Sequence, residues 1–360
     1  MKIVASLGQK KVKIVCSIDA HKCKFPKNRN CRRELISFYL GFKYTFYSKT
    51  QIMIRFAFVF LLLILPNVSV FSQANYEIPA DTQRIVFFGN SITYSGQYIS
   101  YVETYYRLKY PDRELEWVNL GLPSETVSGL SEENHANGAF PRPDLHERLD
   151  RVFEQLKPDL VVVNYGMNDG IYLPFDEGRF QKYKDGINWL DGKIKEIGAE
   201  AIFVTPPVYD PVKGPAYANV LNNYSDWLLS KRYTDGWTVM DIHWPMLNYL
   251  EDQRDLDSTF YLAKDGIHPG EMGHWLMAKE ILLGLGQSEV KNYADLHEAL
   301  ASFPNGQEIL GLVAIRQALL RDAWLTATGH LRPGLAEGIP LKEAEEKARE
   351  IEVQIKELLR

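Results

Sequence analysis

Short apolar segments alternate with helical segments from residue 84 to residue 285, and this alternation leaves few folds open to the chain. Residues 85–88 and 160–163 are apolar at every position, which is typical of strands buried on both faces. Strands and helices in steady succession favour right-handed crossovers and a parallel sheet. The five expected strands are residues 84–88, 116–120, 159–164, 200–205 and 237–241.

Between the strands, apolar residues recur at spacings of three and four, which predicts helices. In residues 144–156, for example, Leu145, Leu149, Val152 and Phe153 fall on one stripe. The expected helices are residues 98–110, 144–156, 177–197, 217–231 and 271–285. The sequence therefore predicts an α/β fold, a three-layer α/β/α sandwich around a five-stranded parallel sheet.

The strand pattern ends near residue 286. Two further helices are expected at residues 306–325 and 341–359, the second with one apolar stripe that favours packing on its own domain over a short coiled coil. We expect residues 80–286 to form the main domain and residues 287–360 a helical C-terminal appendage. The appendage could shape a cleft, mediate dimerisation or cover apolar surface, and the sequence does not decide between these roles.

Polar segments follow the first three strands and precede the last helix of the main domain. They contain Ser91, Gly121, Asn168 and the pair Asp265 and His268. In parallel sheets, ligands bind beyond the carboxyl ends of the strands, where these segments meet. Taken singly, each has a simpler interpretation: a serine helix cap, a glycine turn, an asparagine turn, and an Asp-x-x-His that caps a helix or forms half of a metal site.

Together they supply the groups of a serine hydrolase. A serine at the start of a helix has its backbone N–H directed at a developing oxyanion. Asp265 lies three residues before His268 across a glycine turn, so its carboxylate can hold one ring nitrogen while the other faces the serine. Thr93 replaces the second glycine of a Gly-x-Ser-x-Gly elbow, which argues against the α/β-hydrolase arrangement.

The order of these segments resembles the conserved blocks of the SGNH (GDSL-type) hydrolases, over about residues 84–285. The matching segments are Gly-Asn-Ser-Ile-Thr at 89–93, Gly121, Gly-Met-Asn-Asp at 166–169 and Asp-Gly-Ile-His-Pro at 265–269. The resemblance implies a flavodoxin-like fold and a secreted bacterial esterase. Ser91 would be the nucleophile, His268 the general base and Asp265 its orienting group. The oxyanion hole would consist of the N–H groups of Ser91 and Gly121 and the Asn168 side chain, with no metal and no cofactor.

Two positions depart from the family pattern. Asn90 stands before the serine where the family usually has aspartate, but asparagine keeps an acceptor oxygen, so we expect the turn to survive. Ser124 stands where a further glycine is common. Tyr94 and Tyr172 are candidate substrate contacts by stacking, although packing is the favoured interpretation for each.

The substrate is implied by the resemblance alone. Short acyl esters, above all O-acetyl groups on carbohydrate, are the first expectation, and a lipid or thioester is the alternative within the enzyme class. A non-catalytic carbohydrate-binding surface protein on a degenerate hydrolase fold is the other alternative. The intact Ser91, Asn168, Asp265 and His268 argue against it.

The N-terminal region has a different character. Residues 53–74 have the charge, apolar run and small residues of a signal peptide, which predicts a secreted or periplasmic protein without a stable membrane anchor. Residues 1–52 are strongly basic and are expected to be a spurious or basic extension. Taking the 13 Lys and Arg and the 2 acids of residues 1–74 from the chain's 41 and 46 leaves 28 basic and 44 acidic residues, a net charge of −16. This charge disfavours nucleic acid as a partner.

Overall fold

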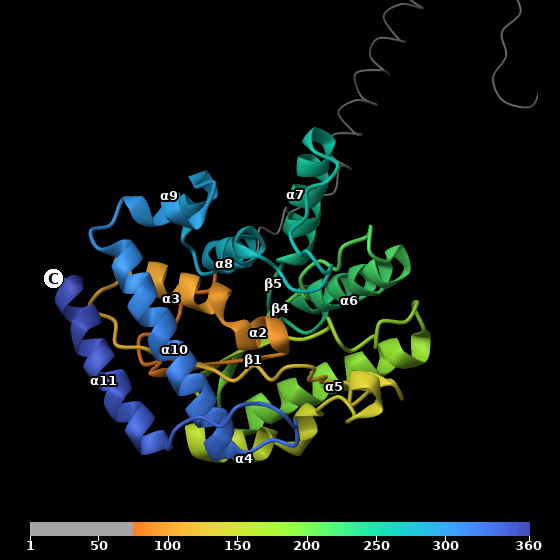
Figure 1. Cartoon of the computed structure of the whole chain (residues 1–360), viewed down its shortest axis with the longest axis horizontal. Coiled ribbons are helices and arrows are strands. Elements are labelled where there is room, and N and C mark those ends of the chain that lie inside the picture. Colours follow the sequence, from red (N-terminus) through yellow and green to blue (C-terminus); the bar gives the residue numbers. More distant parts are fainter. Residues whose placement is uncertain (1–74) are drawn as a thin grey trace, which may run out of the picture. The chain divides into compact units, whose positions relative to one another are not determined.

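The structure of the chain is a computed structural model and describes residues 75–360. The signal peptide expected at residues 53–74 and the extension at residues 1–52 lie outside the described residues. Residues 75–360 belong to one compact unit, built around a parallel sheet in the order β2-β1-β3-β4-β5 (Figure 1). The strands are β1 (Arg84–Gly89), β2 (Glu116–Asn119), β3 (Leu160–Asn164), β4 (Glu200–Val204) and β5 (Thr238–Met240).

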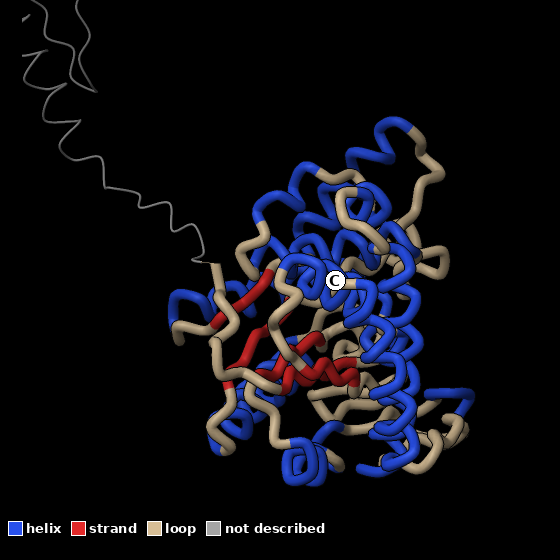
Figure 2. Tube along the Cα trace, turned by 90° about the vertical axis from the view of Figure 1, so that its left-hand side faces the viewer, coloured by secondary structure: helices blue, strands red, loops and turns tan. Residues whose placement is uncertain are grey.

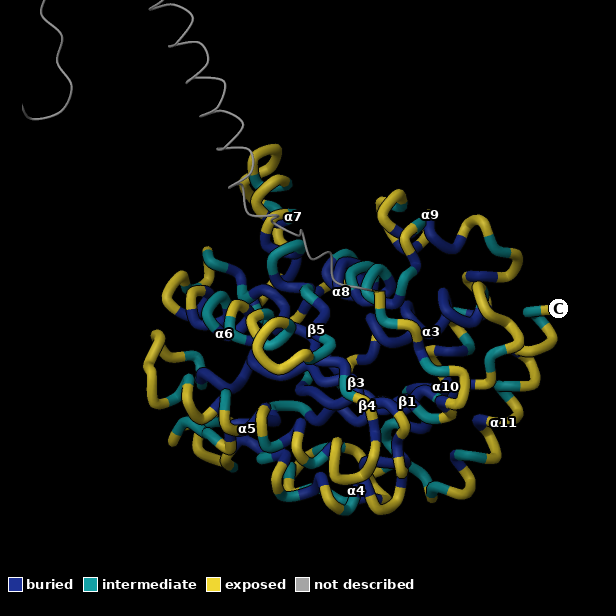
Figure 3. Tube along the Cα trace, turned by 180° about the vertical axis from the view of Figure 1, so that it is seen from behind, coloured by how far each residue is buried: buried dark blue, intermediate teal, exposed yellow. Residues whose placement is uncertain are grey.

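The predicted five-stranded parallel sheet is confirmed, and each strand lies within one residue of its predicted ends. The apolar runs made this possible, because β3 is buried along its whole length and β1 is buried except for Arg84. Val86 at the centre of β1 lies opposite Val118 of β2 and Val161 of β3. Figure 3 shows these central strands as buried, with the exposed residues on the surrounding helices and loops.

Helices cover both faces of the sheet, as Figures 1 and 2 show, so the predicted three-layer sandwich is confirmed. α3 (Gln97–Lys109) and α8 (Glu271–Gly284) pack together on one side of β1, and α4 (Leu149–Leu156) and α5 (Glu177–Glu196) lie on the other. The remaining helices of the sandwich are α2 (Ser91–Ser95), α6 (Pro215–Thr234) and α7 (His243–Leu256). No helix within residues 75–360 is both long and apolar enough to cross a membrane.

One helix prediction was wrong in detail, and one helix was missed. The helix expected at residues 144–156 is interrupted: a short 3₁₀ turn, Leu145–Glu147, precedes α4, and Arg148 between them has a φ of −116°. The Arg148 side chain is drawn into the protein by the buried carboxylate of Glu125. α7 was not predicted, although its buried Met246, Leu247 and Leu250 follow helical spacing, because the stripe is short and the second half is charged.

The C-terminal appendage contains α9 (Leu296–Ala301), α10 (Gly306–Thr328) and α11 (Leu341–Leu358), and its two expected helices are confirmed. α10 packs along α3 and β2. Glu103 of α3 is completely buried and accepts hydrogen bonds from Arg107 on its own helix and from Arg316 and Gln317 on α10. Because a buried carboxylate is stable only when it is well paired, this contact fixes α10 against the sandwich.

Candidate active site

The sheet has a switch point at β1, whose neighbours β2 and β3 lie on opposite sides of it. Open parallel sheets bind ligands beyond the carboxyl ends of strands at such a point. β1 ends at Gly89, and Ser91 is the first residue of α2. The side-chain oxygen of Asn90 accepts a hydrogen bond from the Ile92 N–H at 3.0 Å. Asn90 therefore caps α2 through the side-chain oxygen that asparagine shares with aspartate.

His268 approaches Ser91 from the turn before α8. Its Nε2 lies 2.8 Å from the Ser91 Oγ, and its Nδ1 lies 2.7 Å from one carboxylate oxygen of Asp265. The other carboxylate oxygen accepts hydrogen bonds from the N–H groups of Ile267 and His268 at 2.9 and 2.8 Å. Gly266 permits this turn, because its φ is +87°. The structure thus brings the predicted serine, histidine and aspartate into one hydrogen-bonded row.

The negative charge on Asp265 determines which ring nitrogen of His268 carries a proton. Partial burial raises the pKa of its carboxyl, but hydrogen bonds from the His268 ring and from two backbone N–H groups outweigh that effect and lower the pKa to about 2. An ionised carboxylate facing Nδ1 keeps a proton on that nitrogen, so Nε2 is left to accept from Ser91. The side chains of His268 and Asp265 are each 52% exposed, so a substrate in solution has access to the row.

A second serine–histidine pair lies one helical turn away on α2. The Ser95 Oγ is 3.3 Å from the Nε2 of His274 on α8. His274 is only 3% exposed, and burial, aided by the nearby His268, lowers its pKa to about 4. Its Nδ1 has no hydrogen-bond partner within residues 75–360, so no carboxylate orients this ring. Burial and the missing acceptor make this pair unsuited to catalysis.

Asn168 follows β3 and is buried. Its Nδ2 donates to the backbone oxygen of Glu125 at 3.1 Å, and its Oδ1 accepts from the Tyr172 hydroxyl at 3.0 Å. These two bonds fix which way the amide faces, and they leave one of its two N–H hydrogens for another acceptor.

Two buried acids that the sequence did not single out hold the loops around Asn168. The Asp169 carboxylate accepts hydrogen bonds of 2.8–2.9 Å from the backbone N–H groups of Val127, Ser128 and Gly166. Burial raises the pKa of this carboxyl, and the same hydrogen bonds oppose the rise. Glu125 is also fully buried and forms two hydrogen bonds, of 2.6 and 2.7 Å, with Arg148. The two acids join the loop after β2 to the loop after β3 and to α4.

Gly121 is the predicted oxyanion donor of the loop after β2. Its N–H donates to the side-chain oxygen of Asn119 at 2.9 Å, so it is already engaged. A Cβ at Gly121 would lie 2.3 Å from the backbone nitrogen of Tyr94. The loop therefore approaches α2 so closely that only glycine, which has no side chain, fits at this position. The packing alone therefore explains the glycine, and its role as an oxyanion donor stays a prediction.

Ser124 offers a free donor in the same loop. Residues 122–125 form a turn closed by the Glu125 N–H and the Leu122 carbonyl at 3.1 Å, with Pro123 in second place. Ser124, in third place, has a φ of +70°, which fits a type II turn and explains why glycine is favoured there. Its N–H donates to no group within residues 75–360. The sequence does contain a signal for this turn: Pro123 is followed by Ser124, which stands where the family commonly has glycine.

The predicted substrate contacts Tyr94 and Tyr172 both have protein partners. The guanidinium of Arg321 lies 3.9 Å from the ring centre of Tyr94, whose hydroxyl is 3.3 Å from the Asp322 carboxylate. The Tyr172 hydroxyl donates to Asn168. Both tyrosines are partly exposed, so their contact with substrate stays a prediction.

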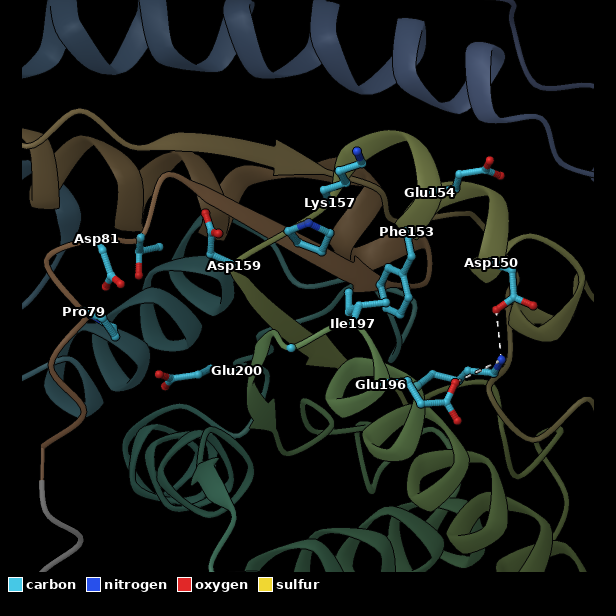
Figure 4. Close-up of a pocket in the computed structure, with 14 residues that line it drawn as sticks. Pro79, Asp81, Asp150, Phe153, Glu154, Lys157, Asp159, Glu196, Ile197 and Glu200 are labelled. Atoms are coloured by element: carbon cyan, nitrogen blue, oxygen red, sulfur yellow. Dashed lines mark ion pairs between the residues drawn. The ribbon is translucent and has the colours of Figure 1, made fainter.

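A cavity of about 680 Å³ lies at the opposite end of the sheet, where the strands begin (Figure 4). Several acids line it, but they serve the fold: Asp159 accepts from the N–H groups of Gln83 and Arg84 at 2.8 Å, and Glu200 accepts from the Tyr76 hydroxyl at 2.6 Å. No cluster of His, Cys, Asp and Glu within residues 75–360 could hold a metal ion. The groups suited to catalysis therefore gather at the carboxyl end of the strands.

Comparison with protein families places part of this chain in a known family. The GDSL-like Lipase/Acylhydrolase family matches residues 87–276, which include Ser91, Asn168, Asp265 and His268. The comparison with curated proteins finds no match.

Several solved structures have a similar fold. BT4096, a gut microbial diltiazem-metabolizing enzyme, is 21% identical over 59% of this chain and 48% of its own, with a TM-score of 0.48. A catalytic mutant of Axe2, an acetylxylan esterase from Geobacillus stearothermophilus, is 21% identical over 59% of this chain and 97% of its own, with a TM-score of 0.47. LAE5, an alpha/beta hydrolase enzyme from the metagenome of Lake Arreo, Spain, is 22% identical over 58% and 97%, with a TM-score of 0.46. The chain thus spans about half the length of the first.

Proposed function

This chain belongs to the GDSL-like lipase/acylhydrolase family and is a carboxylic ester hydrolase, and we propose that Ser91, His268 and Asp265 are its catalytic triad. The observation that carries the proposal is the continuous row from the Ser91 Oγ through both ring nitrogens of His268 to the Asp265 carboxylate, at 2.8 and 2.7 Å. No other serine–histidine pair in residues 75–360 has both an exposed ring and a carboxylate behind it.

Acylation begins when Nε2 of His268 takes the proton of Ser91 and Oγ attacks the ester carbonyl. The bond to the leaving alcohol breaks, and His268 returns the proton to the alcohol oxygen. Water then attacks the acyl-serine, again with His268 as base, and releases the carboxylic acid and free Ser91. Asp265 stays ionised throughout and stabilises the charged imidazole.

The negative oxygen of each tetrahedral intermediate needs donors that are in place beforehand. The Ser91 N–H at the start of α2 and the second amide hydrogen of Asn168 are two of them. The third comes from the loop after β2, where the Ser124 N–H has no partner within residues 75–360 and the Gly121 N–H is engaged by Asn119. Each such donor contributes about 3 kcal/mol to transition-state stabilisation.

The substrate class we propose is a short acyl ester, foremost O-acetyl, on a carbohydrate. Two properties of the chain support it. The side chains of His268 and Asp265 are half exposed, which leaves room for a bulky alcohol such as a sugar chain. The net charge of −16 on residues 75–360 repels anionic membranes and favours a neutral polymer.

We also propose that the chain is exported, with cleavage after Ser72 or Ala74, because residues 53–74 have the pattern of a signal peptide. N-terminal sequencing of the protein from its native host tests this. A mature chain that begins at Met1 would contradict it.

The esterase mechanism is tested with the full chain, Ser91→Ala and Ser95→Ala, using p-nitrophenyl acetate. Ser95 is the matched control, because it lies on the same helix and also contacts a histidine. We expect Ser91→Ala to lose at least about a thousandfold in kcat/KM, and Ser95→Ala to stay within a few-fold of the wild type. Equal loss in both variants, or none in Ser91→Ala, would show that the nucleophile is wrong.

Substrate class is then tested by acetate release from acetylated xylo-oligosaccharides and by hydrolysis of p-nitrophenyl octanoate. Acetate release that depends on Ser91 supports the carbohydrate proposal. Faster hydrolysis of the octanoate than of the acetate, with no acetate release, would favour a lipid ester instead.

A further inference from the structure

The segment that follows α10 contacts the turn that carries Ser124. The Nε of Arg332 donates to the Pro123 carbonyl oxygen at 3.1 Å, and its guanidinium lies 5.6 Å from the ring centre of Phe140. On the next peptide, Arg142 donates to the Ser124 carbonyl oxygen at 3.4 Å. Each central residue of the turn therefore has its carbonyl held by an arginine. Arg332 lies outside residues 87–276, the part of the chain that matches the family.

The Pro123 carbonyl and the Ser124 N–H belong to the same peptide group. Because a peptide group is planar, fixing the direction of its oxygen also fixes the direction of its N–H. A guanidinium at the oxygen also polarises the amide, which makes the N–H a stronger donor. The contact matters more here because Ser124 is held at a φ of +70°, a conformation that serine rarely adopts unaided.

Contacts other than Arg332 hold this C-terminal segment in place. At its start, Arg151 of α4 donates to the Thr328 carbonyl oxygen at 2.9 Å. Further along, the N–H of Gly338 donates to the Thr326 hydroxyl at 2.8 Å. Because the segment is anchored on both sides, the bond from Arg332 to Pro123 is not needed to dock it, and its effect falls on the turn.

We propose that Arg332 is a positioning residue of the oxyanion hole, which holds the Pro123–Ser124 peptide so that the Ser124 N–H is directed at the developing oxyanion. The inference rests on the proposed function, since it concerns the same serine chemistry. It assigns a role to the appendage beyond that of covering apolar surface: the catalytic domain depends on residues that follow α10 for full activity.

The test compares the full chain with Arg332→Ala, Arg332→Lys and the control Arg151→Ala, using p-nitrophenyl acetate. In Arg332→Ala we expect kcat to fall about 10- to 100-fold while KM stays within about twofold, because the donor acts mainly in the transition state. Arg332→Lys keeps one donor and should recover part of the loss. Arg151→Ala removes one anchor of the segment but keeps the Gly338 anchor and the bond from Arg332 to Pro123, so it should leave kcat near the wild-type value.

A second measurement separates positioning from general damage. An alkylboronic acid forms a tetrahedral, negatively charged adduct with the nucleophilic serine, so it occupies the oxyanion hole. Its inhibition constant should rise in Arg332→Ala by about the factor by which kcat falls, with an unchanged Tm. A Tm that falls equally in Arg332→Ala and Arg151→Ala, with equal loss of activity, would overturn the inference.

The remaining outcomes separate the two proposals. A wild-type chain with no esterase activity contradicts the proposed function, and with it the role of Arg332. An active wild type with an equally active Arg332→Ala contradicts the role of Arg332 alone. A change confined to KM would also overturn it, because it would place Arg332 in ground-state binding.

Discussion

The two serine–histidine pairs found within residues 75–360 lie one helical turn apart and differ in almost every property that matters for catalysis. Ser91 and His268 are 2.8 Å apart, and the histidine side chain is half exposed. Ser95 and His274 are 3.3 Å apart, and the histidine is buried. Proximity of a serine to a histidine is therefore a weak criterion for catalysis, and the surroundings of the histidine's second nitrogen are more informative.

That second nitrogen has opposite surroundings in the two pairs. Nδ1 of His268 faces an ionised carboxylate, which holds a proton there and directs the basic nitrogen at the serine. Nδ1 of His274 has no partner among the described residues, and burial lowers the pKa of its ring to about 4. His274 stacks on Tyr98 with an interplanar angle of 7°, as a packing residue does.

Replacing each of the two histidines by asparagine should give the largest difference in activity. His268→Asn removes the general base, and we expect kcat/KM to fall by about 10⁶. His274→Asn changes a packed residue, and we expect at least about a tenth of the wild-type activity with a lower Tm. Steady-state kinetics and thermal unfolding check both variants. If His274→Asn folds but is as inactive as His268→Asn, His274 is more than a packing residue.

Asp265→Asn should have the next largest effect, about ten-thousandfold on kcat. The amide oxygen of the new asparagine can still accept hydrogen bonds from the Ile267 and His268 N–H groups. Its amide nitrogen, however, then faces Nδ1 of His268 and donates a hydrogen bond to it. The ring must therefore carry its proton on Nε2, and it can no longer accept one from Ser91.

The matched control for this exchange is Asp144→Asn. Asp144 lies 2.6 Å from the Nδ1 of His146, so the chain offers the same carboxylate–histidine contact without a serine beside it. We expect its kcat to stay within about threefold of the wild type, as for most surface substitutions. Comparable losses in the two asparagine variants would refute a specific role for Asp265.

Local sequence was sufficient to predict much of this site. The strands could be predicted because their apolar residues are continuous, and Ser91 follows the first of them directly. Asp265 and His268 belong to one turn with a glycine between them, so their contact depends on neighbouring residues only.

The features that were missed depend on contacts between distant parts of the chain. The donor at Ser124 became visible only with its φ of +70°, and the turn is held by Arg332, which lies about 200 residues away in sequence. The helix expected at residues 144–156 is interrupted where Arg148 reaches Glu125. Local sequence patterns cannot predict such pairings, because they form only when the distant segments pack together in the folded chain.

The buried His274 should also make the stability of the folded chain depend on pH. Histidines in unfolded chains titrate near pH 6.5, whereas burial lowers the pKa of His274 to about 4 in the folded chain. Between these values the unfolded state binds more protons, so the free energy of unfolding falls as the pH drops from about 6.5 to 4.

For His274 the loss is on the order of 2–3 kcal/mol. His243, whose pKa burial also lowers to about 4, adds a loss of its own, so the wild type alone cannot assign the effect. The contribution of His243 cancels between the wild type and His274→Asn. Urea unfolding of both at pH 7, 5.5 and 4.5 should therefore show their difference in stability shrinking by about 2 kcal/mol as the pH falls. A difference that stays constant would mean that His274 takes up its proton in the folded chain, and the contrast with His268 would then rest on the missing carboxylate alone.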